Sequence, residues 1–199
     1  MIYASLFAAL TAAGAFLSIP IGPVPIVLQN LFVFLAGLLL GRRWGVWSVA
    51  IYLLTGTLGL PIFAGGTGGI AKLAGPTGGY LLGYLPAVFV IGLLFEKLPK
   101  KPLFSVMAMT LGALIVYACG VPWLKAVTGM AWSKALTAGL YPFLPGDALK
   151  IAAAVPIARV LKEFIRRCPL YVNPLLRFRI SAICFQTAAS ESTMFPIRS

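Results

Sequence analysis

Six long apolar runs, separated by short breaks, organise most of the chain. The runs are continuous and do not alternate between apolar and polar residues with a period of two, so they predict helices rather than strands. Their lengths approach the roughly 20 residues that a helix needs to cross the hydrocarbon core of a bilayer. We therefore expect an all-α membrane protein, a bundle of six transmembrane helices. The expected spans are 2–19, 26–41, 44–60, 79–95, 103–121 and 144–165.

The composition agrees with this pattern. Of the 199 residues, 60% are hydrophobic and 10% are charged, whereas a soluble domain carries roughly 25% charged residues. A soluble fold of this length could not bury so much apolar surface, so lipid must be the solvent. No Lys or Arg precedes the first run, and a secretory signal needs a basic start. We therefore expect the run 2–19 to be retained as a transmembrane helix.

The net charge of +12, from 16 Lys and Arg against 4 Asp and Glu, indicates orientation rather than nucleic-acid binding. The basic residues lie mostly at the ends of apolar runs and form no patch interleaved with aromatics. Five basic residues follow the second and fourth expected helices, whereas the opposite loops hold three. The positive-inside rule then predicts a multi-pass protein of the cytoplasmic (inner) membrane with both termini cytoplasmic. The five are Arg42, Arg43, Lys97, Lys100 and Lys101, and the three are Lys72, Lys125 and Lys134.

The residue types that most enzymes use are scarce. Histidine is absent, and the three cysteines, Cys119, Cys168 and Cys184, show no CxxC spacing. The commonest general base and the commonest metal ligand are therefore missing, and no disulfide framework is indicated. We expect no catalytic residues, no metal and no cofactor. An intramembrane enzyme and a structural membrane scaffold remain as less favoured functional classes.

A charged pair, Asp147 and Lys150, opens the last expected helix. The two residues are three positions apart, so they share one helix face, and Pro145 just before them suits a helix start. By the topology above they lie near the outer end, where a charge in hydrocarbon costs about 3 kcal/mol. Two interpretations are open. Asp147 is a helix-dipole anchor with Lys150 reaching outward to solvent, or the pair makes polar contacts in a ligand cavity.

Glycines crowd the connection between the third and fourth expected helices, in the segments 65–69 and 75–79. Such a loop exposes backbone N–H groups and lets the chain approach a ligand or a neighbouring helix closely. The sequence has no GxGxxG at a strand-to-helix turn and no GK[ST], which disfavours a nucleotide site. The loop either covers a ligand or packs as a re-entrant segment against helices.

Small residues and amides mark two further surfaces. Ala4, Ala8 and Ala12 recur every four residues, a spacing that lets helices approach closely in lipid, either inside the bundle or against another membrane subunit. Gln29 and Asn30 begin the second helix, and they should face the bundle interior because unpaired amides are unfavourable in lipid. The first and third loops and the starts of the fourth and sixth helices all meet the outer face. This convergence predicts a pocket that opens outward.

The end of the chain, residues 166–199, loses the long apolar runs and holds five of the sixteen basic residues. No motif is visible there. We expect a disordered basic tail, or sequence unrelated to the transmembrane domain of residues 1–165.

Four motifs, in this order and spacing, resemble the BioY family: PVPIVLQN, LAGLLLG, GPTGGYLLGY and PFLPGDALK. BioY proteins are the biotin-specific substrate-binding (S) components of energy-coupling factor transporters. The resemblance covers about residues 1–165 and implies six helices with biotin bound near the outer face. It also implies a transmembrane T subunit and two cytoplasmic ATPase subunits as partners. An S component or solitary facilitator for another small vitamin is the nearest alternative.

The resemblance also implies roles for individual residues. Asp147 and Lys150 match the family's polar ligand contacts, and the stripe of Ala4, Ala8 and Ala12 matches the surface that meets the T subunit. Biotin has two ureido N–H donors, for which Asp147 is a suitable acceptor, and oxygen atoms to which Lys150 can donate. The other implied biotin contacts are Gln29, Gly75, Thr77, Gly78 and Tyr80.

Overall fold

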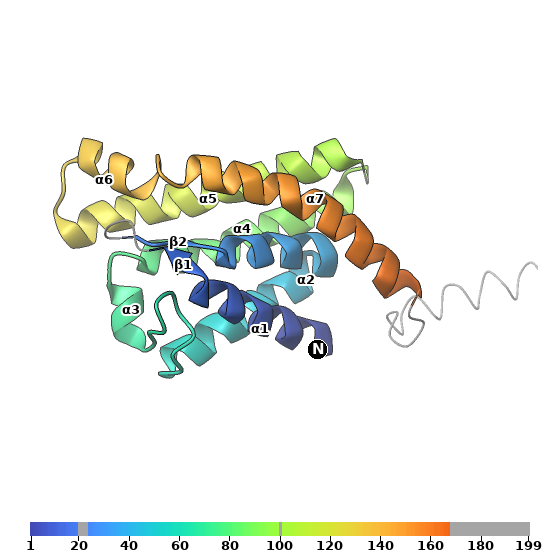
Figure 1. The fold of residues 1–199 in the computed structure, drawn as a ribbon, viewed down its shortest axis with the longest axis horizontal. Coiled ribbons are helices and arrows are strands. Elements are labelled where there is room, and N and C mark those ends of the chain that lie inside the picture. The colour runs from blue at the N-terminus through green and yellow to red at the C-terminus, as the bar shows by residue number, and fades with distance from the viewer. Residues whose placement is uncertain (20–23, 100, 168–199) are drawn as a thin grey trace, which may run out of the picture. The chain divides into compact units, whose positions relative to one another are not determined.

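The computed structural model describes residues 1–19, 24–99 and 101–167. Residues Met1–Arg159 form one compact unit, which is described here by itself. The described ranges contain seven helices and two strands of two residues each. These are α1 (Ile2–Phe16), β1 (Ser18–Ile19), β2 (Ile26–Val27), α2 (Gln29–Thr57), α3 (Ile70–Ala74), α4 (Gly78–Lys97), α5 (Pro102–Thr128), α6 (Trp132–Gly139) and α7 (Leu144–Arg167) (Figure 1). The expected tail lies, from residue 168 onward, outside the described residues.

The chain is mostly helical, as the apolar runs predict. Among the described residues, α2, α4 and α5 are long and apolar enough to cross a membrane, and α1 is a shorter apolar helix. The departure from an all-α chain is an antiparallel ribbon in which Ser18 pairs with Val27 and Ile19 with Ile26. Ile19 precedes a proline, and the residue before a proline is biased toward extended backbone. This local bias explains why a ribbon forms between α1 and α2.

Helix α2 folds back on itself at Gly41. This residue has non-helical angles, with φ of 73° and ψ of −175°. A Cβ on Gly45 would lie 3.4 Å from the Cα of Gly37, although eight residues of straight helix span about 12 Å. The element therefore consists of two arms joined by a sharp turn. The turn falls where the sequence predicts the break between the spans 26–41 and 44–60.

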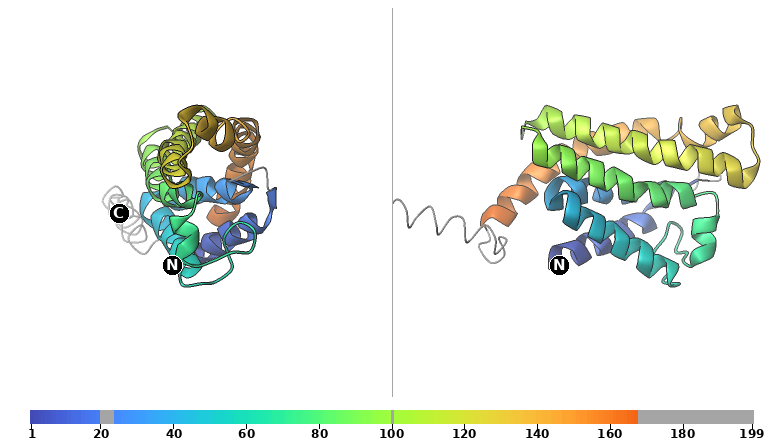
Figure 2. Two further views of the ribbon diagram at one scale, coloured as in Figure 1. Left: turned by 90° about the vertical axis from the view of Figure 1, so that its left-hand side faces the viewer. Right: turned by 180° about the vertical axis from the view of Figure 1, so that it is seen from behind.

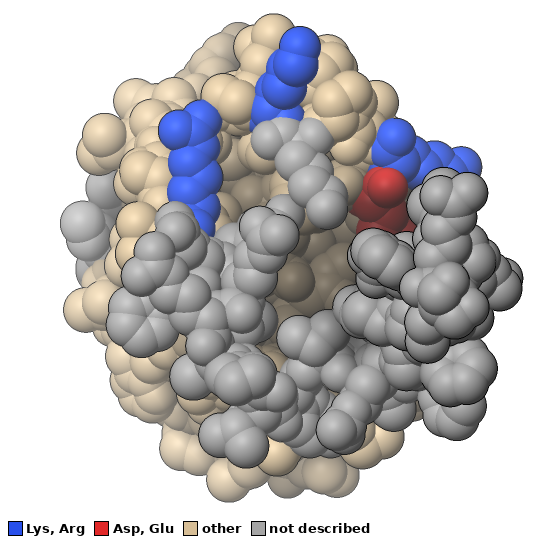
Figure 3. Space-filling view, turned by 90° about the vertical axis from the view of Figure 1, so that its right-hand side faces the viewer, with Lys and Arg blue, Asp and Glu red and all other residues tan. Residues whose placement is uncertain are grey.

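Glu96, at the end of α4, holds this turn. Its Oε1 accepts a hydrogen bond from the backbone N–H of Arg42 (2.9 Å), and its Oε2 lies 3.2 Å from Nε of the same residue. A carboxylate at the start of the second arm also interacts favourably with the helix dipole. Lys and Arg side chains are spread over this end face (Figure 3). The turn is thus the point where α4 and both arms of α2 are tied together.

Helix α4 is the centre of the unit because it packs against both α2 and α5 (Figure 2). Val88 and Ile91 of α4 lie over Gly37 of α2, and Gly83 of α4 lies against Cys119 of α5. Small residues at such contacts let helices approach closely in lipid. The close packing on both sides fixes where the first turns of α4, with their two tyrosines, stand in the unit.

The alanine stripe of α1 faces into the unit. Ala4 and Ala8 are 2% and 6% exposed, Ala12 is half-buried, and α1 packs against α2. Ala9 and Ala13, on the other side of α1, are exposed. Packing inside the chain, one of the two alternatives, accounts for the stripe. Because Ala4 and Ala8 are buried, they are not accessible to a partner subunit while α1 packs against α2.

Replacing Gly41 with alanine should destabilise the turn of α2. A Cβ there would lie 2.6 Å from Glu96 Oε1, and glycine alone adopts this backbone region readily. We expect a loss of about 1–3 kcal/mol, measured as a lower Tm of the detergent-purified protein. Gly146→Ala is the control, because nothing lies within 4 Å of its Cβ position. Equal Tm values for the two variants would show that the turn tolerates a side chain.

A second pair of variants tests which side of α1 is packed. Ala8→Leu overfills the contact with α2, and overpacking costs about 1–3 kcal/mol, so its Tm should fall. Ala9→Leu adds the same atoms on the exposed side and should leave the Tm close to that of the parent. A lower Tm for Ala9→Leu than for Ala8→Leu would reverse the assignment of the two faces.

Candidate functional site

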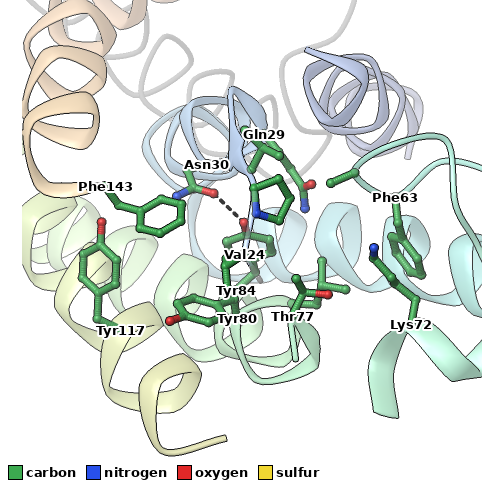
Figure 4. A pocket seen from close by; sticks show the side chains of 14 residues that line it. Val24, Gln29, Asn30, Phe63, Lys72, Thr77, Tyr80, Tyr84, Tyr117 and Phe143 are labelled. Atoms are coloured by element: carbon green, nitrogen blue, oxygen red, sulfur yellow. Dashed lines mark hydrogen bonds between the residues drawn. The ribbon is translucent and has the colours of Figure 1, made fainter. Parts of the chain in front are cut away.

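A cavity lies between β2, the start of α2, the connection from α2 to α4, and the tyrosine-bearing turns of α4 and α5 (Figure 4). It holds about 490 Å³ free of protein atoms, a volume that includes its open mouth. Its walls are mainly aromatic and aliphatic, with a few polar side chains. The aromatic residues are Phe63, Tyr80, Tyr84, Tyr117 and Phe143, and the polar ones are Gln29, Asn30, Lys72 and Thr77.

Two tyrosines of α4 form one wall of the cavity. Tyr80 and Tyr84 are four residues apart, so they stand on the same helix face, and both are buried. The Tyr80 hydroxyl donates to the carbonyl oxygen of Gly139 in α6 (2.8 Å). Its ring occupies the space that a side chain at Gly120 would need. The Tyr84 hydroxyl donates to Oδ1 of Asn30 in α2 (Figure 4). Tyr80 is therefore held through its ring and its hydroxyl, and Tyr84 through its hydroxyl, which gives the cavity a defined wall.

The buried carboxylate of Asp147 is contacted by donor side chains from three helices, α7, α5 and α2. Lys150 Nζ lies 2.8 Å from its Oδ1. The Tyr117 hydroxyl donates to Oδ2 at 2.5 Å, and Asn30 Nδ2 makes a longer contact of 3.5 Å with the same oxygen. Because Asn30 also accepts from Tyr84, the hydrogen-bonded chain runs from α4 through α2 to α7 and α5. Both oxygens of Asp147 are engaged within the protein.

One of the two interpretations of the pair expects Lys150 to reach outward to solvent. The structure shows instead that Lys150 is buried. The side chains of Lys150 and Asp147 are 8% and 5% exposed and form a direct ion pair. An unpaired charge in an apolar interior is expensive, so the lysine gains more by turning toward the carboxylate than by solvation at the membrane surface. Removing one member of a buried pair typically costs about 3–5 kcal/mol. The pair is therefore a fixed neutral unit inside the bundle.

Tyr117 stands between the charged pair and the cavity. It lines the cavity, and it also lines a separate cleft between α5 and α7, whose wall includes Asp147. Asp147 and Lys150 are not among the described residues that line the cavity itself. The pair therefore lies outside the described lining of the cavity, and the Tyr117 hydroxyl and Asn30 connect Asp147 to it.

The other residues expected at the site divide into two groups. Gln29, Thr77 and Tyr80 line the cavity. Gly75 and Gly78 are absent from its described lining and shape the connection instead. The Gly75 carbonyl accepts a hydrogen bond from Trp123 Nε1 (3.0 Å), and a side chain at Gly78 would collide with the backbone of α3. These glycines place the start of α4 beside the cavity without facing it.

Several lining residues escaped the sequence analysis. Tyr84 could have been found from its spacing of four residues after Tyr80. Asn30 was expected to face the interior but was not assigned to the site. Lys72 contributes to the expected topology and is not among the expected site residues. Tyr117 and Phe143 lie among other apolar residues, and no local pattern distinguishes them from core positions.

The described residues contain no group of three His, Cys, Asp or Glu side chains that could hold a metal ion. What the site offers is aromatic surface and hydrogen bonding for an organic molecule. Together with the apolar helices, this defines a helical membrane protein with a mainly apolar cavity that carries a few polar side chains.

The chain belongs to the BioY family, whose model matches residues 1–167. It is 46% identical over 158 residues to "Probable biotin transporter BioY" of Pyrococcus horikoshii, covering 79% of this chain and 93% of that protein. It is 44% identical over 164 residues to "Biotin transporter BioY" of Thermotoga maritima, covering 82% and 95%. The family expected from the four motifs is thereby confirmed.

The fold is also similar to a solved structure, the crystal structure of the S-component for biotin from an ECF-type ABC transporter. The TM-score is 0.77 at 35% sequence identity, and the match covers 81% of this chain and 89% of the other. The family model, the relatives and the solved structure each match most of the unit that holds the cavity.

Removing the Tyr117 hydroxyl should weaken the network around Asp147. Tyr117→Phe keeps the ring but leaves Asp147 Oδ2 with only the long contact from Asn30, and an unmet hydrogen bond to a buried charged group costs about 1.5–3 kcal/mol. We expect a lower Tm in detergent. Tyr141→Phe, at a tyrosine that is 58% exposed, should leave the Tm unchanged.

The effects of changing Tyr117 and Asp147 on stability should not be additive. Asp147→Asn removes the charge to which the Tyr117 hydroxyl donates. Adding Tyr117→Phe to this variant should therefore lower the Tm less than Tyr117→Phe does in the parent. Strictly additive losses would show that the two groups act independently.

Proposed function

We propose that this chain is the biotin-binding S component of an energy-coupling factor transporter and imports biotin across the cytoplasmic membrane. The observation that carries the proposal is the aromatic cavity with a few buried polar groups, in a chain of the BioY family. Relatives are named biotin transporters, and the similar solved structure is an S component for biotin. Apolar walls suit the fused rings and alkyl chain of biotin, while the polar groups fix its orientation.

The proposed topology has six spans: α1, the two arms of α2, α4, α5 and α7, with both termini cytoplasmic. The Gly41 turn supports it, because the turn makes two folded-back arms out of one long element. Arg42 follows this turn, and Lys97 and Lys101 lie where α4 ends and α5 begins. The positive-inside rule assigns such an end to the cytoplasm. The cavity lies near α3 and α6, toward the opposite end (Figure 1), and so would open outward.

Asp147 and Lys150 are proposed to bind polar groups of biotin after a local rearrangement. Tyr117 separates the pair from the cavity, and the carboxylate already accepts bonds from Tyr117 and Asn30. A ureido N–H of the ligand would replace one of these donors. Exchanging one hydrogen bond for another costs little, whereas leaving the carboxylate unmet costs much more. Rotation of the Tyr117 side chain is therefore a low-cost way to bring the ligand to Asp147.

Transport also needs energy from outside this chain. The sequence has no phosphate-binding loop of the GK[ST] type, so ATP hydrolysis would come from partners. We propose a transmembrane T subunit and two cytoplasmic ATPase subunits. On α1, the exposed side with Ala9 and Ala13 is free to meet another membrane subunit, whereas Ala4 and Ala8 are buried.

Biotin affinity, measured by calorimetry on detergent-purified protein, tests the function and its residues together. The parent should bind biotin and not other vitamins of similar size. Asp147→Ala and Lys150→Ala should each weaken binding about 10- to 150-fold, because a hydrogen bond to a charged group contributes about 1.5–3 kcal/mol. Asp147→Asn should weaken it less than Asp147→Ala, because the amide keeps the size and a carbonyl acceptor.

The matched control is Lys134→Ala, an exposed lysine of α6, which should bind like the parent. A Tm for each variant separates lost affinity from lost folding. Parent-like affinity in both Asp147→Ala and Lys150→Ala would reduce the pair to a structural anchor. Tight binding of a different vitamin would transfer the function to that ligand.

A further inference from the structure

Aromatic and basic side chains gather where α5 ends and α6 turns back against it. The two helices pack together (Figure 1), with Gly139 of α6 beside Leu124 of α5, whereas Trp132 and Lys134 of α6 are exposed. Lys125 of α5 belongs to the same group, because its Nζ lies 4.3 Å from the centroid of the Trp132 ring. We call Lys125, Trp132 and Lys134 the α5–α6 surface.

The length of α5 places this surface at the level of lipid headgroups. The helix has 27 residues and therefore spans about 40 Å, whereas the hydrocarbon core of a bilayer is about 30 Å thick. At the average tilt of about 20°, α5 still exceeds the core by roughly 8 Å. Exposed Trp and Tyr side chains are typical of the headgroup level, and Trp132 and Tyr141 are 52% and 58% exposed.

The positive charge of the α5–α6 surface is not balanced by nearby acidic residues. Residues 97–146 contain no Asp or Glu, and the acidic residue that follows them, Asp147, is buried and paired with Lys150. In the part of the chain that the structure describes, neither Lys125 nor Lys134 takes part in an ion pair. Charge complementarity therefore favours an anionic partner for this surface.

We propose that the α5–α6 surface binds the headgroup phosphate of an anionic phospholipid. Its two ammonium groups can donate charge-assisted hydrogen bonds to phosphate oxygens, and the cation–π contact with Trp132 holds Lys125 in place. A glycerol headgroup fits better than choline, which would bring a third cation to a surface that already has two.

This lipid site is separate from the ligand cavity, because none of the three residues of the α5–α6 surface is part of the described cavity lining. The proposed topology assigns the lipid to the outer leaflet. Binding itself does not depend on that topology, because the length of α5 and the charges are the same in either orientation.

Quenching of tryptophan fluorescence by brominated lipids tests the surface in a bilayer. The chain has four tryptophans, and the reporter variant Trp44→Phe, Trp47→Phe keeps Trp123 and Trp132, which lie in the last turns of α5 and in the first turn of α6. The reporter is reconstituted in mixtures of phosphatidylglycerol and phosphatidylcholine, with one lipid or the other brominated. The quenching gives the relative affinity of the two lipids beside these tryptophans, and we expect phosphatidylglycerol to be preferred.

Charge variants in the reporter background assign the preference to the two lysines. Lys125→Gln and Lys134→Gln should each lower it about fivefold, the effect of one basic residue at an anionic lipid surface, whereas Lys134→Arg should retain it. Lys97→Gln is the matched control, because it removes an exposed charge about 27 Å along α4 from Gly79, which lies against Trp123. This distance exceeds the screening length of about 8–10 Å, so the preference should not change.

Equal affinity of the reporter for the two lipids would overturn the proposal. A preference for phosphatidylglycerol that survives in the double variant Lys125→Gln, Lys134→Gln would do the same. A preference that inorganic phosphate abolishes, and that chloride at the same ionic strength does not, would assign the surface to free phosphate instead of a lipid. A Tm for each variant confirms folding, and biotin affinity in detergent should stay at the parent value, so the lipid site and the proposed function are tested separately.

Discussion

The arrangement of the bundle depends on one buried carboxylate. Asp147 is buried, and an isolated charge in an apolar interior is prohibitively costly, so the helices must bring donors to it. Lys150 comes from its own helix, Tyr117 from α5 and Asn30 from α2, and Asn30 is in turn held by Tyr84 of α4. A shift of any of these helices would leave a polar group unmet. Such satisfied networks favour one arrangement of helices over its alternatives.

The same network decides how the cavity is built. Tyr117 lines the cavity while its hydroxyl is bonded to Asp147, and the charged pair is not part of the described lining. Asp147 is bonded to Tyr117 at one side of the cavity, while the half-buried Lys72 lines the other side. The cavity is polarised even though its walls are mostly aromatic. A ligand with unlike polar ends therefore meets unlike surroundings, which is a physical basis for one binding orientation.

A second polar cluster stabilises the opposite end. Glu96 bonds both the backbone and the guanidinium of Arg42, and it occupies the space that a side chain at Gly41 would need. This contact is half exposed, so it is weaker than the buried network. Its importance is geometric, because it closes the turn from which the second arm of α2 starts. That arm carries Tyr52 and Gly56, on which the Lys72-bearing connection is anchored.

The sequence alone determined the features that depend on near neighbours along the chain. Apolar run lengths predicted the long helices but not the short α3 and α6. The break at Gly41 was located to within a few residues, and the spacing of Asp147 and Lys150 placed them on one face. The tertiary structure decided the rest. Periodicity shows that Ala4 and Ala8 share a face, but not that this face turns toward α2. Tyr117 and Asn30 are 30 and 117 positions from Asp147, and no local pattern predicts their meeting. Such contacts follow from the packing of whole helices, because a buried charge selects its partners by distance in space rather than along the chain.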